Sequence, residues 1–325
     1  MTFARRKLVC LFCQSRAFST SFRRLAEQAG KPPPDSATRS VTGRRIQQNL
    51  PINPALADAP RAYGQRHEEF VPQPLSRPIG MPYPPEPGQN TGIDFRTYRQ
   101  RRDDFVNYDK HLEKREKLKS KISRPYFRDW GNLQFHKGKT FVAPPRPFKA
   151  EHSLFFPNLY GQTLLKSDPS PRDTTPTLYG KISVVCMFSS VWAENQIKTF
   201  ISKESNPALG AMLREHKDVA QLVHVNHEDG AMKAMLIKMF MGGIRKAVGE
   251  ENWDKYFIVR RGISDEIREN IGLLNSRVGY VYLVDADLRI RWAGCAMSEQ
   301  DERDGLIKGL WRLLDEEERN TSKET

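Results

Sequence analysis

The stretch GKISVVCMFSSVWAE, residues 180–194, decides the fold of this chain. Its apolar, β-branched run over 181–188 follows a turn signal at Gly180 and predicts a buried strand. From Val191 onward the apolar residues recur at helical spacing, which predicts a helix over 191–203. A buried strand that passes through two serines into a helix is the start of a strand–helix–strand unit.

The alternation of strand and helix patterns continues to the C-terminus. The pattern predicts a short helix from Asn206-Pro207, a strand over 219–225, a helix over 229–248, a strand over 256–259, a helix capped by Ser264, a hairpin of 279–285 with 288–293, and a helix from Ser298. This order predicts an α/β class: a thioredoxin-like domain over 151–317, with a mixed central sheet flanked by helices. Residues 318–325 are expected to form a disordered tail.

Thioredoxin chemistry requires a thiolate at the N-terminus of the helix that follows the first core strand. Ser189, Ser190 and Trp192 lie in that turn, and it contains no cysteine. The proline that normally precedes the third core strand aligns best with Gly279. We therefore expect no catalytic residue and no enzyme activity. A degenerate thioredoxin- or peroxiredoxin-like oxidoreductase that uses Cys186 or Cys295 is the alternative.

Two further motifs contain residue types that bind metals or phosphates. The cluster of His224, His227, Glu228 and Asp229 lies at a strand end without the spacing of a tetrahedral metal site. The Gly-Gly pair within 241–244 lacks the Lys-Ser/Thr ending of a phosphate loop. We therefore expect neither a metal nor a cofactor.

The N-terminal region differs in composition from the rest. The first 150 residues contain 29 basic and 13 acidic side chains, against 23 and 26 in the remainder, and 17 of the 22 prolines. Such a chain buries too little apolar surface to offset the entropy of ordering. A basic, proline-rich, largely extended N-terminal region is therefore expected, with a disordered linker over 31–93. The apolar runs at 182–188 and 234–241 are too short to cross a bilayer.

Residues 1–30 have the composition of a mitochondrial transit peptide. Up to Ala26 they contain six basic residues, several hydroxyl side chains and no acidic one. The run from Arg16 to Ser21 is similar to matrix-processing sites, which predicts cleavage near Phe18. Cys10 and Cys13 would be removed with this segment.

Residues 94–150 are expected to form a basic helix and an extended aromatic and proline-rich arm. Over 94–121 a thin apolar stripe predicts an amphipathic helix. It could bind anionic lipid, RNA or an acidic protein surface, or rest on the main domain. The aromatic and arginine residues of 124–130 and 144–148 suit an interface or packing against their own domain.

Four stretches resemble a known family, the fungal mitochondrial ATP synthase assembly factors called ATPase complex subunit ten. They are Arg124–Trp130, His152–Leu159, Gly279–Asp285 and Ile290–Gly294. The resemblance covers about Ser123 to Glu316. It implies a peripheral protein on the matrix side of the inner membrane. It also implies a chaperone for the F0 sector that binds newly made subunit a (subunit 6) and promotes its assembly with the subunit c ring.

Such a chaperone needs a surface for its partner. The aromatic arm and a helix rich in methionine, whose side chains adapt to varied apolar surfaces, are the candidates. The partner-binding residues are expected to be Tyr126, Phe127, Arg128, Trp130, Met232, Met235 and Met239. No nucleic acid is expected as a partner, because no RNA-recognition signature accompanies the charge. A mitochondrial RNA- or ribosome-associated protein remains an alternative.

Overall fold

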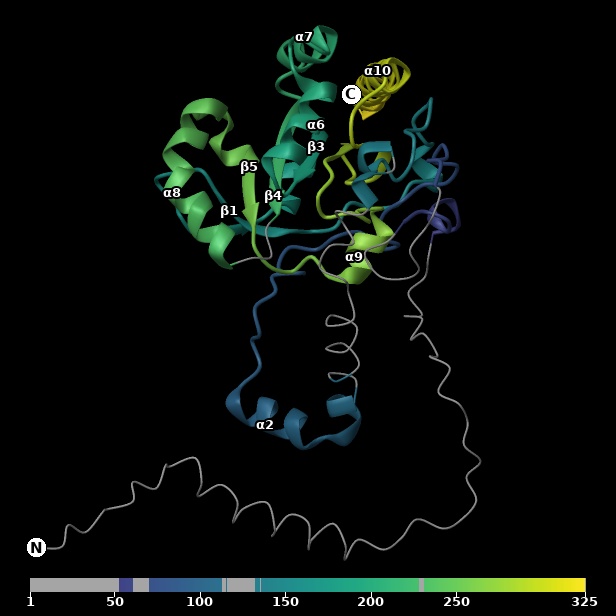
Figure 1. Ribbon diagram of the computed structural model, residues 1–325. Helices are drawn as coiled ribbons and strands as arrows, with labels where there is room; N and C mark the ends of the chain where they lie inside the picture. Colours follow the sequence, from purple (N-terminus) through teal and green to yellow (C-terminus); the bar gives the residue numbers. More distant parts are fainter. Residues whose placement is uncertain are drawn as a thin grey trace, which may run out of the picture. The chain divides into compact units, whose positions relative to one another are not determined.

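The computed structural model describes residues 53–60, 70–112, 115, 132–134, 136–227 and 231–324 (Figure 1). All of them belong to the unit formed by residues 47–325. The predicted transit peptide, residues 1–30, lies outside the described residues, and so does the aromatic segment 124–130.

Within the described residues, seven strands form one sheet in the order β2-β1-β5-β4-β3-β6-β7. They are β1 (Tyr160–Thr163), β2 (Pro171–Asp173), β3 (Ile182–Phe188), β4 (Ala220–His227), β5 (Tyr256–Val259), β6 (Tyr280–Val284) and β7 (Ile290–Cys295). Strand β3 is parallel to β4 and antiparallel to β6, and β6 pairs with β7 across a hairpin. The order β4-β3-β6-β7 with these directions is that of the thioredoxin fold, so the predicted fold class is confirmed.

Side-chain caps mark the start of three of the six main helices in the described residues. The six helices are α5 (Thr175–Leu178), α6 (Val191–Ile201), α7 (Pro207–Glu215), α8 (Ala231–Val248), α9 (Asp265–Asn270) and α10 (Gln300–Glu324). The side chains of Ser190, Asn206 and Ser264 each accept a hydrogen bond from a backbone N–H of the first turn. Short 3₁₀ segments complete the structure: η2 (Pro54–Leu56), η3 (Asn132–Gln134), η4 (His136–Gly138), η5 (Ala150–His152) and η6 (Glu250–Lys255).

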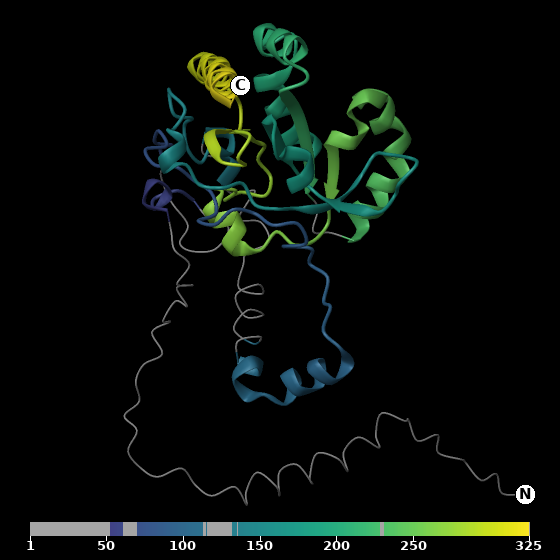
Figure 2. The ribbon, with the colours of Figure 1, turned by 180° about the vertical axis from the view of Figure 1, so that it is seen from behind.

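The sheet separates two apolar clusters, because side chains alternate between its faces. On one face, α6, α7 and α10 contribute Phe200, Leu209 and Leu310, which pack in a cluster with Cys186 of β3. On the other face the cluster contains Cys295 and residues of α5 and α9. Both views show α7 and α10 on one side of the molecule and α9 on the opposite side (Figures 1 and 2).

Part of the predicted linker belongs to the core, which corrects the expectation of disorder over 31–93. Leu56, Leu75 and Ile79, from the described stretches 53–60 and 70–93, are at most 3% exposed and pack in the cluster with Cys295. Proline removes a backbone donor but does not prevent its neighbours from burying apolar side chains. The packed domain therefore includes chain that precedes residue 151.

Residues 139–156 cover the outer edge of β7. The N–H of Phe148 donates to the carbonyl of Arg291 at 2.7 Å, and that of Ile290 donates to Leu154 at 2.7 Å. Residues 73–81 pair in turn with this covering segment, through an isolated bridge between Met81 and Phe155. Of the two uses considered for 144–148, packing against its own domain is the one seen here, because Nε1 of Trp292 also donates to the carbonyl of Pro144 at 2.9 Å.

Two helix boundaries differ from the prediction. Helix α10 continues to Glu324, which corrects the expectation of a disordered tail from 318. Asp315 pairs with Arg319 one turn later at 2.6 Å in this last part of the helix. The helix expected over 94–121 is interrupted at Asn107, which leaves the helical conformation at the end of α2 (Tyr98–Val106). Helical backbone resumes over residues 108–112.

Candidate functional site

The position of the thioredoxin reactive turn contains two serines that stabilise local structure. Ser190 is the N-cap of α6, and its Oγ accepts a hydrogen bond from the N–H of Ala193 at 3.2 Å. The hydroxyl of Ser189 donates to the carbonyl of Ser276, at the entry to β6. Val191 and Trp192 follow and are 72% and 52% exposed. This turn therefore presents apolar side chains where the oxidoreductases present a thiol.

Gly279 lies at the position where the fold usually has proline. Its N–H donates to Oε1 of Gln196 at 3.0 Å, and Nε2 of Gln196 donates to the carbonyl of Lys137 at 3.1 Å. A Cβ on Gly279 would lie 2.4 Å from the carbonyl oxygen of Ala193. Helix α6 therefore packs directly against the backbone of Gly279, and Gln196 joins α6 to the backbone of Lys137.

Several residues with left-handed backbone lie at the junction formed by Gly279, Gln196 and Lys137. His136, Lys137 and Gly138 have φ angles of 44°, 56° and 86°, and Ala296 has 59°. The N–H of Ala296 donates to the carbonyl of Gly279 at 2.9 Å. Non-glycine residues in this region cost on the order of 1 kcal/mol each and persist where surrounding contacts fix them. The junction is thus held rigidly by bonds from three separate parts of the chain.

The two described cysteines are buried in different apolar clusters, on opposite faces of the sheet. Burial raises the pKa of the Cys186 thiol well above its usual range. Burial also raises the pKa of Cys295, although hydrogen bonds with Thr140 and Phe141 oppose that shift. Because the thiolate is the reactive form, both residues are weak nucleophiles, and their placement prevents them from pairing.

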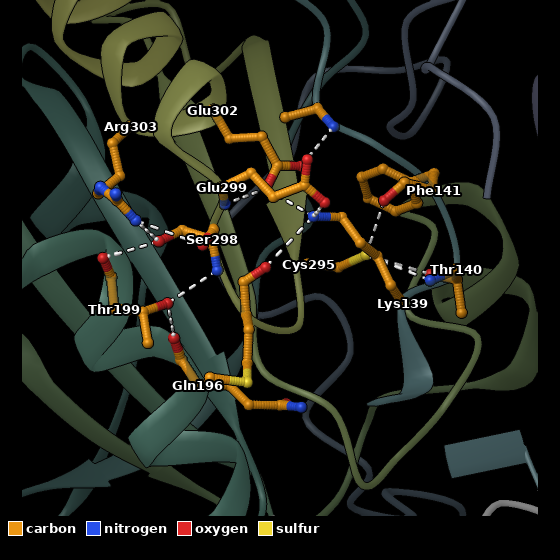
Figure 3. Close-up of polar contacts among 12 residues, drawn as sticks. Lys139, Thr140, Phe141, Gln196, Thr199, Cys295, Ser298, Glu299, Glu302 and Arg303 are labelled. Atoms are coloured by element: carbon orange, nitrogen blue, oxygen red, sulfur yellow. Dashed lines mark hydrogen bonds and ion pairs between the residues drawn. The ribbon is translucent and has the colours of Figure 1, made fainter. Parts of the chain in front are cut away.

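A buried ion pair joins the covering segment to α10 (Figure 3). Nζ of Lys139 lies 2.6 Å from Oε2 of Glu302, and the two side chains are 5% and 2% exposed. Glu302 also accepts the N–H of Ala143 at 2.9 Å and that of Glu299 at 3.0 Å. Lys139 further donates to the carbonyl of Met297 at 3.2 Å. Every charge brought into this site is therefore compensated by hydrogen bonds.

Arg291 of β7 forms a second buried charge cluster. Its guanidinium donates to the carbonyl of Phe148 at 2.7 Å, to Asp285 at 3.2 Å and to Glu316 at 2.9 Å. Burial raises the pKa of Asp285, while hydrogen bonds from Arg289 and Arg291 oppose that shift. Strand, covering segment and α10 thus meet at one arginine.

The histidine considered as a metal ligand is part of an aromatic cluster. The ring of His224 stacks on Tyr256, with centroids 5.8 Å apart, and meets the ring of Phe188 edge-on at 6.2 Å. Burial lowers the pKa of His224 to about 4 and raises that of Tyr256 to about 12. Among the described residues no group of three His, Cys, Asp or Glu side chains could hold a metal ion.

Most of the predicted partner-binding residues are not placed by the structure. Tyr126, Phe127, Arg128 and Trp130 lie outside the described residues. Met232 and Met235 belong to α8 by their backbone, and their side chains are not described. Met239 is 68% exposed, next to exposed Phe240. Sequence reasoning missed the Lys139–Glu302 pair, because nothing in the spacing of two residues 163 positions apart indicates a contact.

The geometry defines a class: a thioredoxin-fold protein that has serines at the reactive turn and buried, unpaired thiols. No helix of the described part of the chain is both long and apolar enough to cross a membrane. The profile of the family described as ATP10 protein matches residues 60–313. The chain belongs to that family.

Individual relatives agree with the family profile. The Mitochondrial ATPase complex subunit ATP10 of Eremothecium gossypii is 31% identical over 267 residues, which cover 81% of this chain and 89% of that protein. The protein of the same name from Saccharomyces cerevisiae is 28% identical over 259 residues, covering 76% and 88%.

Solved structures with a similar fold include a secreted thiol-disulfide isomerase from Corynebacterium glutamicum. It has 9% identity and a TM-score of 0.36, and the match covers 55% of this chain and 99% of that one. A DsbF homologue from Corynebacterium diphtheriae has 15% identity and a TM-score of 0.32, with 50% and 88% covered. Because these TM-scores are low, the fold assignment depends on the strand order and directions described above.

Proposed function

We propose that this protein is an assembly factor for the membrane sector of mitochondrial ATP synthase. It binds newly made subunit a (subunit 6) and promotes the assembly of that subunit with the subunit c ring. The observation that carries the proposal is family membership over residues 60–313, with relatives named as mitochondrial ATPase complex subunits. The protein acts in the mitochondrion, as a peripheral protein on the matrix side of the inner membrane.

The proposed role is that of a scaffold and needs no catalytic group. Three observations support this view: serines at the reactive turn, burial that raises the pKa of both described thiols, and exposed Val191 and Trp192 beside the turn. Such a surface suits binding, whereas disulfide exchange depends on an accessible thiolate.

Complementation tests the function directly. A yeast strain that lacks its own family member is given this chain, and newly made subunit a is labelled and followed into complexes with the subunit c ring. The expected result is restored assembly. Failure of a well-expressed, correctly imported chain to restore it would contradict the proposal. Salt-sensitive retention of RNA, without any effect on assembly, would favour the RNA-associated alternative.

Replacement of both buried cysteines separates the scaffold from the oxidoreductase. The double variant Cys186→Ser, Cys295→Ser is expected to retain full assembly activity when its thermal unfolding shows a folded domain. Cys186→Ala, Cys295→Ala serves as the matched control, because alanine avoids a buried hydroxyl. Loss of activity in both variants, with folding retained, would favour redox chemistry.

The partner surface proposed from sequence is tested by truncating its aromatic side chains. Tyr126, Phe127 and Trp130 are replaced together by alanine, and co-purification of subunit a is measured. Arg128→Ala and Met239→Ala extend the test to the charged residue and to α8. Reduced recovery with a folded domain is expected, and unchanged recovery would remove this surface.

A further inference from the structure

Helix α8 has apolar residues on its outer side as well as on the side that faces the core. Met241, Ile244 and Val248 pack against the apolar cluster that α6 and α10 also cover. Met239 and Phe240 belong to the same turns of the helix and are 68% and 61% exposed. A surface helix normally shows polar residues on its outer face, and a helix that is apolar on both faces is normally covered. The outer face of α8 is therefore expected to meet a partner.

The outer face of α8 combines apolar residues with one lysine. Gly243, Lys246 and Ala247 follow Met239 and Phe240 by three, four or seven positions, so all five residues share this face. The side chains of Lys246 and Ala247 are exposed, and a Cβ on Gly243 would meet nothing within 4 Å. The face is thus an open apolar strip with a cation at its C-terminal end.

The charge of α8 has one sign. Its 18 residues contain no acidic side chain, and the charged residues are all basic: Lys233, Lys238, Arg245 and Lys246. The acidic residues at 228–229 and 250–251 lie outside the helix. Within the part of the chain that the structure describes, neither Arg245 nor Lys246 forms an ion pair with a carboxylate. The helix therefore attracts a negatively charged partner.

Trp253 lies against two cations near the C-terminal end of α8. The guanidinium of Arg245 lies 5.8 Å from the centroid of the Trp253 ring, and Nζ of Lys166 lies 5.2 Å from it. Nε of Arg245 donates to the carbonyl of Leu164 at 2.7 Å. These partners orient the two cations but carry no negative charge. The positive charge at this end of α8 is therefore left uncompensated.

Helix α2 differs from α8 in exactly this respect. It also exposes an aromatic side chain, since Phe105 is 73% exposed. Its cations, however, are paired with carboxylates of the same segment: Arg101 lies 3.4 Å from Asp94, and Arg102 lies 3.1 Å from Asp103. Exposed apolar residues occur on both helices, but only on α8 do they accompany cations that lack such partners among the described residues.

We propose that the outer face of α8 binds the surface of a membrane that contains anionic lipid. Met239 and Phe240 insert between the headgroups, and the ammonium of Lys246 lies beside the lipid phosphates. Helices that lie in a membrane interface combine apolar residues with lysine and arginine, and a lysine stem can follow apolar surface while its charge reaches the headgroups. The inference rests on the proposed function, which places the protein at the inner membrane.

A lipid surface suits this face better than a groove on a protein. Helices that bind grooves carry large anchor residues at spacings of three, four and seven. Three and seven positions after Phe240 the chain has Gly243 and Ala247, which offer no anchor. Headgroups and acyl chains adapt to such an uneven face, and lipid phosphates supply the negative charge that it lacks.

Site-specific photo-crosslinking to lipid tests the proposal. A benzophenone amino acid replaces Phe240 in the full chain, and the matched variant carries it at Trp311 of α10, which is 63% exposed. Each protein is irradiated with vesicles of phosphatidylcholine, either alone or with about 30% phosphatidylglycerol. We expect lipid adducts from position 240 with the anionic vesicles, and about tenfold fewer from position 311 or with the neutral vesicles. Equal yields from both positions, or from both kinds of vesicle, would overturn the inference.

Reversal of one charge separates a local contact from attraction by the whole basic chain. Lys246→Glu and its control Lys308→Glu in α10 change the net charge equally, and both lysines are exposed. In the protein with the probe at position 240, Lys246→Glu should lower the yield of lipid adduct about tenfold, and Lys308→Glu less than about twofold. Thermal unfolding midpoints should stay unchanged in both variants. Equal losses in the two variants would contradict a specific contact at α8.

The same probe distinguishes this inference from the proposed function. Restored assembly by the chain, without a lipid adduct from position 240, would remove the lipid contact and leave the function intact. A lipid adduct from a chain that restores no assembly would support the contact while the function fails. In mitochondria that are making labelled subunits, an adduct of position 240 with an ATP synthase polypeptide in place of lipid would assign α8 to a protein partner and overturn the inference.

Discussion

At the scale of single residues, the Lys139–Glu302 pair is the buried ionic contact between the covering segment and α10. A buried ion pair contributes little more to the stability of a protein than an apolar pair of similar volume. Removal of one partner, however, leaves the other charge unpaired in a poorly hydrated site, which is strongly destabilising. Here Glu302 also binds two backbone N–H groups, so its carboxylate serves the covering segment and the start of α10 together. The pair is therefore a specific joint between distant parts of the chain.

Replacing Lys139 alone should destabilise the protein strongly. Lys139→Met leaves the Glu302 carboxylate buried without its cation, and we expect a loss of about 3–5 kcal/mol in the free energy of unfolding measured with urea. Lys139→Met, Glu302→Gln should recover much of that loss, because the amide oxygen still accepts the two backbone bonds. Lys137→Met, at an exposed neighbour, is the control. Equal stability of Lys139→Met and wild type would show that the pair is not buried as described.

Gly279 is expected to tolerate no side chain. The Cβ of Gly279→Ala would approach the carbonyl oxygen of Ala193 to 2.4 Å, so α6 must shift and the bond to Gln196 must weaken. We expect a loss of about 1–3 kcal/mol, measured by thermal unfolding. Gly242→Ala in α8 is the matched control: a Cβ there meets nothing within 4 Å, and alanine favours the helix by about 0.5–1 kcal/mol. A neutral Gly279→Ala would contradict the direct packing of α6 on this glycine.

At the scale of elements, the irregular segments are as much a part of the fold as the helices. Residues 73–81 pair with the covering segment, which pairs in turn with β7, so two layers of extended chain continue the sheet beyond its last strand. The glycine that allows this close approach is Gly80, whose Cβ would lie 2.8 Å from the backbone of Leu154 and Phe155.

Truncation of one side chain in residues 73–81 should therefore behave as a core mutation. Ile79 is fully buried, and Ile79→Ala should cost about 2–5 kcal/mol through lost burial and the cavity that remains. Val71→Ala, at a side chain that is 64% exposed, should change stability by less than about 0.5 kcal/mol. Urea denaturation of the two variants measures the difference. If both are neutral, the segment is not part of the core.

The elements that sequence reasoning located share one property: their pattern is local. The strand from Ile182, the caps at Ser190 and Ser264, and the hairpin at β6 and β7 are all specified within a few residues. The packing of residues 73–81 was missed because its apolar residues follow no helical or strand period. Its partners also lie far away in the sequence. The Lys139–Glu302 joint was missed for the same reason, since charge alone does not indicate burial.

At the scale of the whole molecule, the sheet separates two apolar clusters. We expect low pH to destabilise the protein through a histidine in one of them. His224 lies between Phe188 and Tyr256, on the face covered by α6. Its neutral form is favoured by burial, while the carboxylate of Glu194 favours the charged form. A histidine that resists protonation makes the folded state bind fewer protons than the unfolded state in mild acid.

Global stability should fall as the pH drops from 6.5 to about 4. In the unfolded chain His224 takes up its proton near pH 6.5, whereas in the folded protein it does so only near pH 4. Its contribution is full above pH 6.5 and is lost across this range. We expect the free energy of unfolding to fall by about 2 kcal/mol across this range. The loss is smaller than the full pKa difference implies, because the half-buried His224 keeps some contact with water. Urea midpoints across this pH range measure the slope. His224→Phe should flatten it, and an unchanged slope in that variant would assign the effect to other groups.

The covered edge of β7 has a consequence for how the chain is made. Lys139 leaves the ribosome 163 residues before Glu302, and the strand that residues 139–156 cover follows more than 130 residues later. Until β7 and α10 emerge, Phe141, Phe156 and Ile79 have no completed face to pack against. The protein closes its own sheet only when its last helix is available, so a chain that stops early leaves both an open strand edge and a row of apolar side chains exposed.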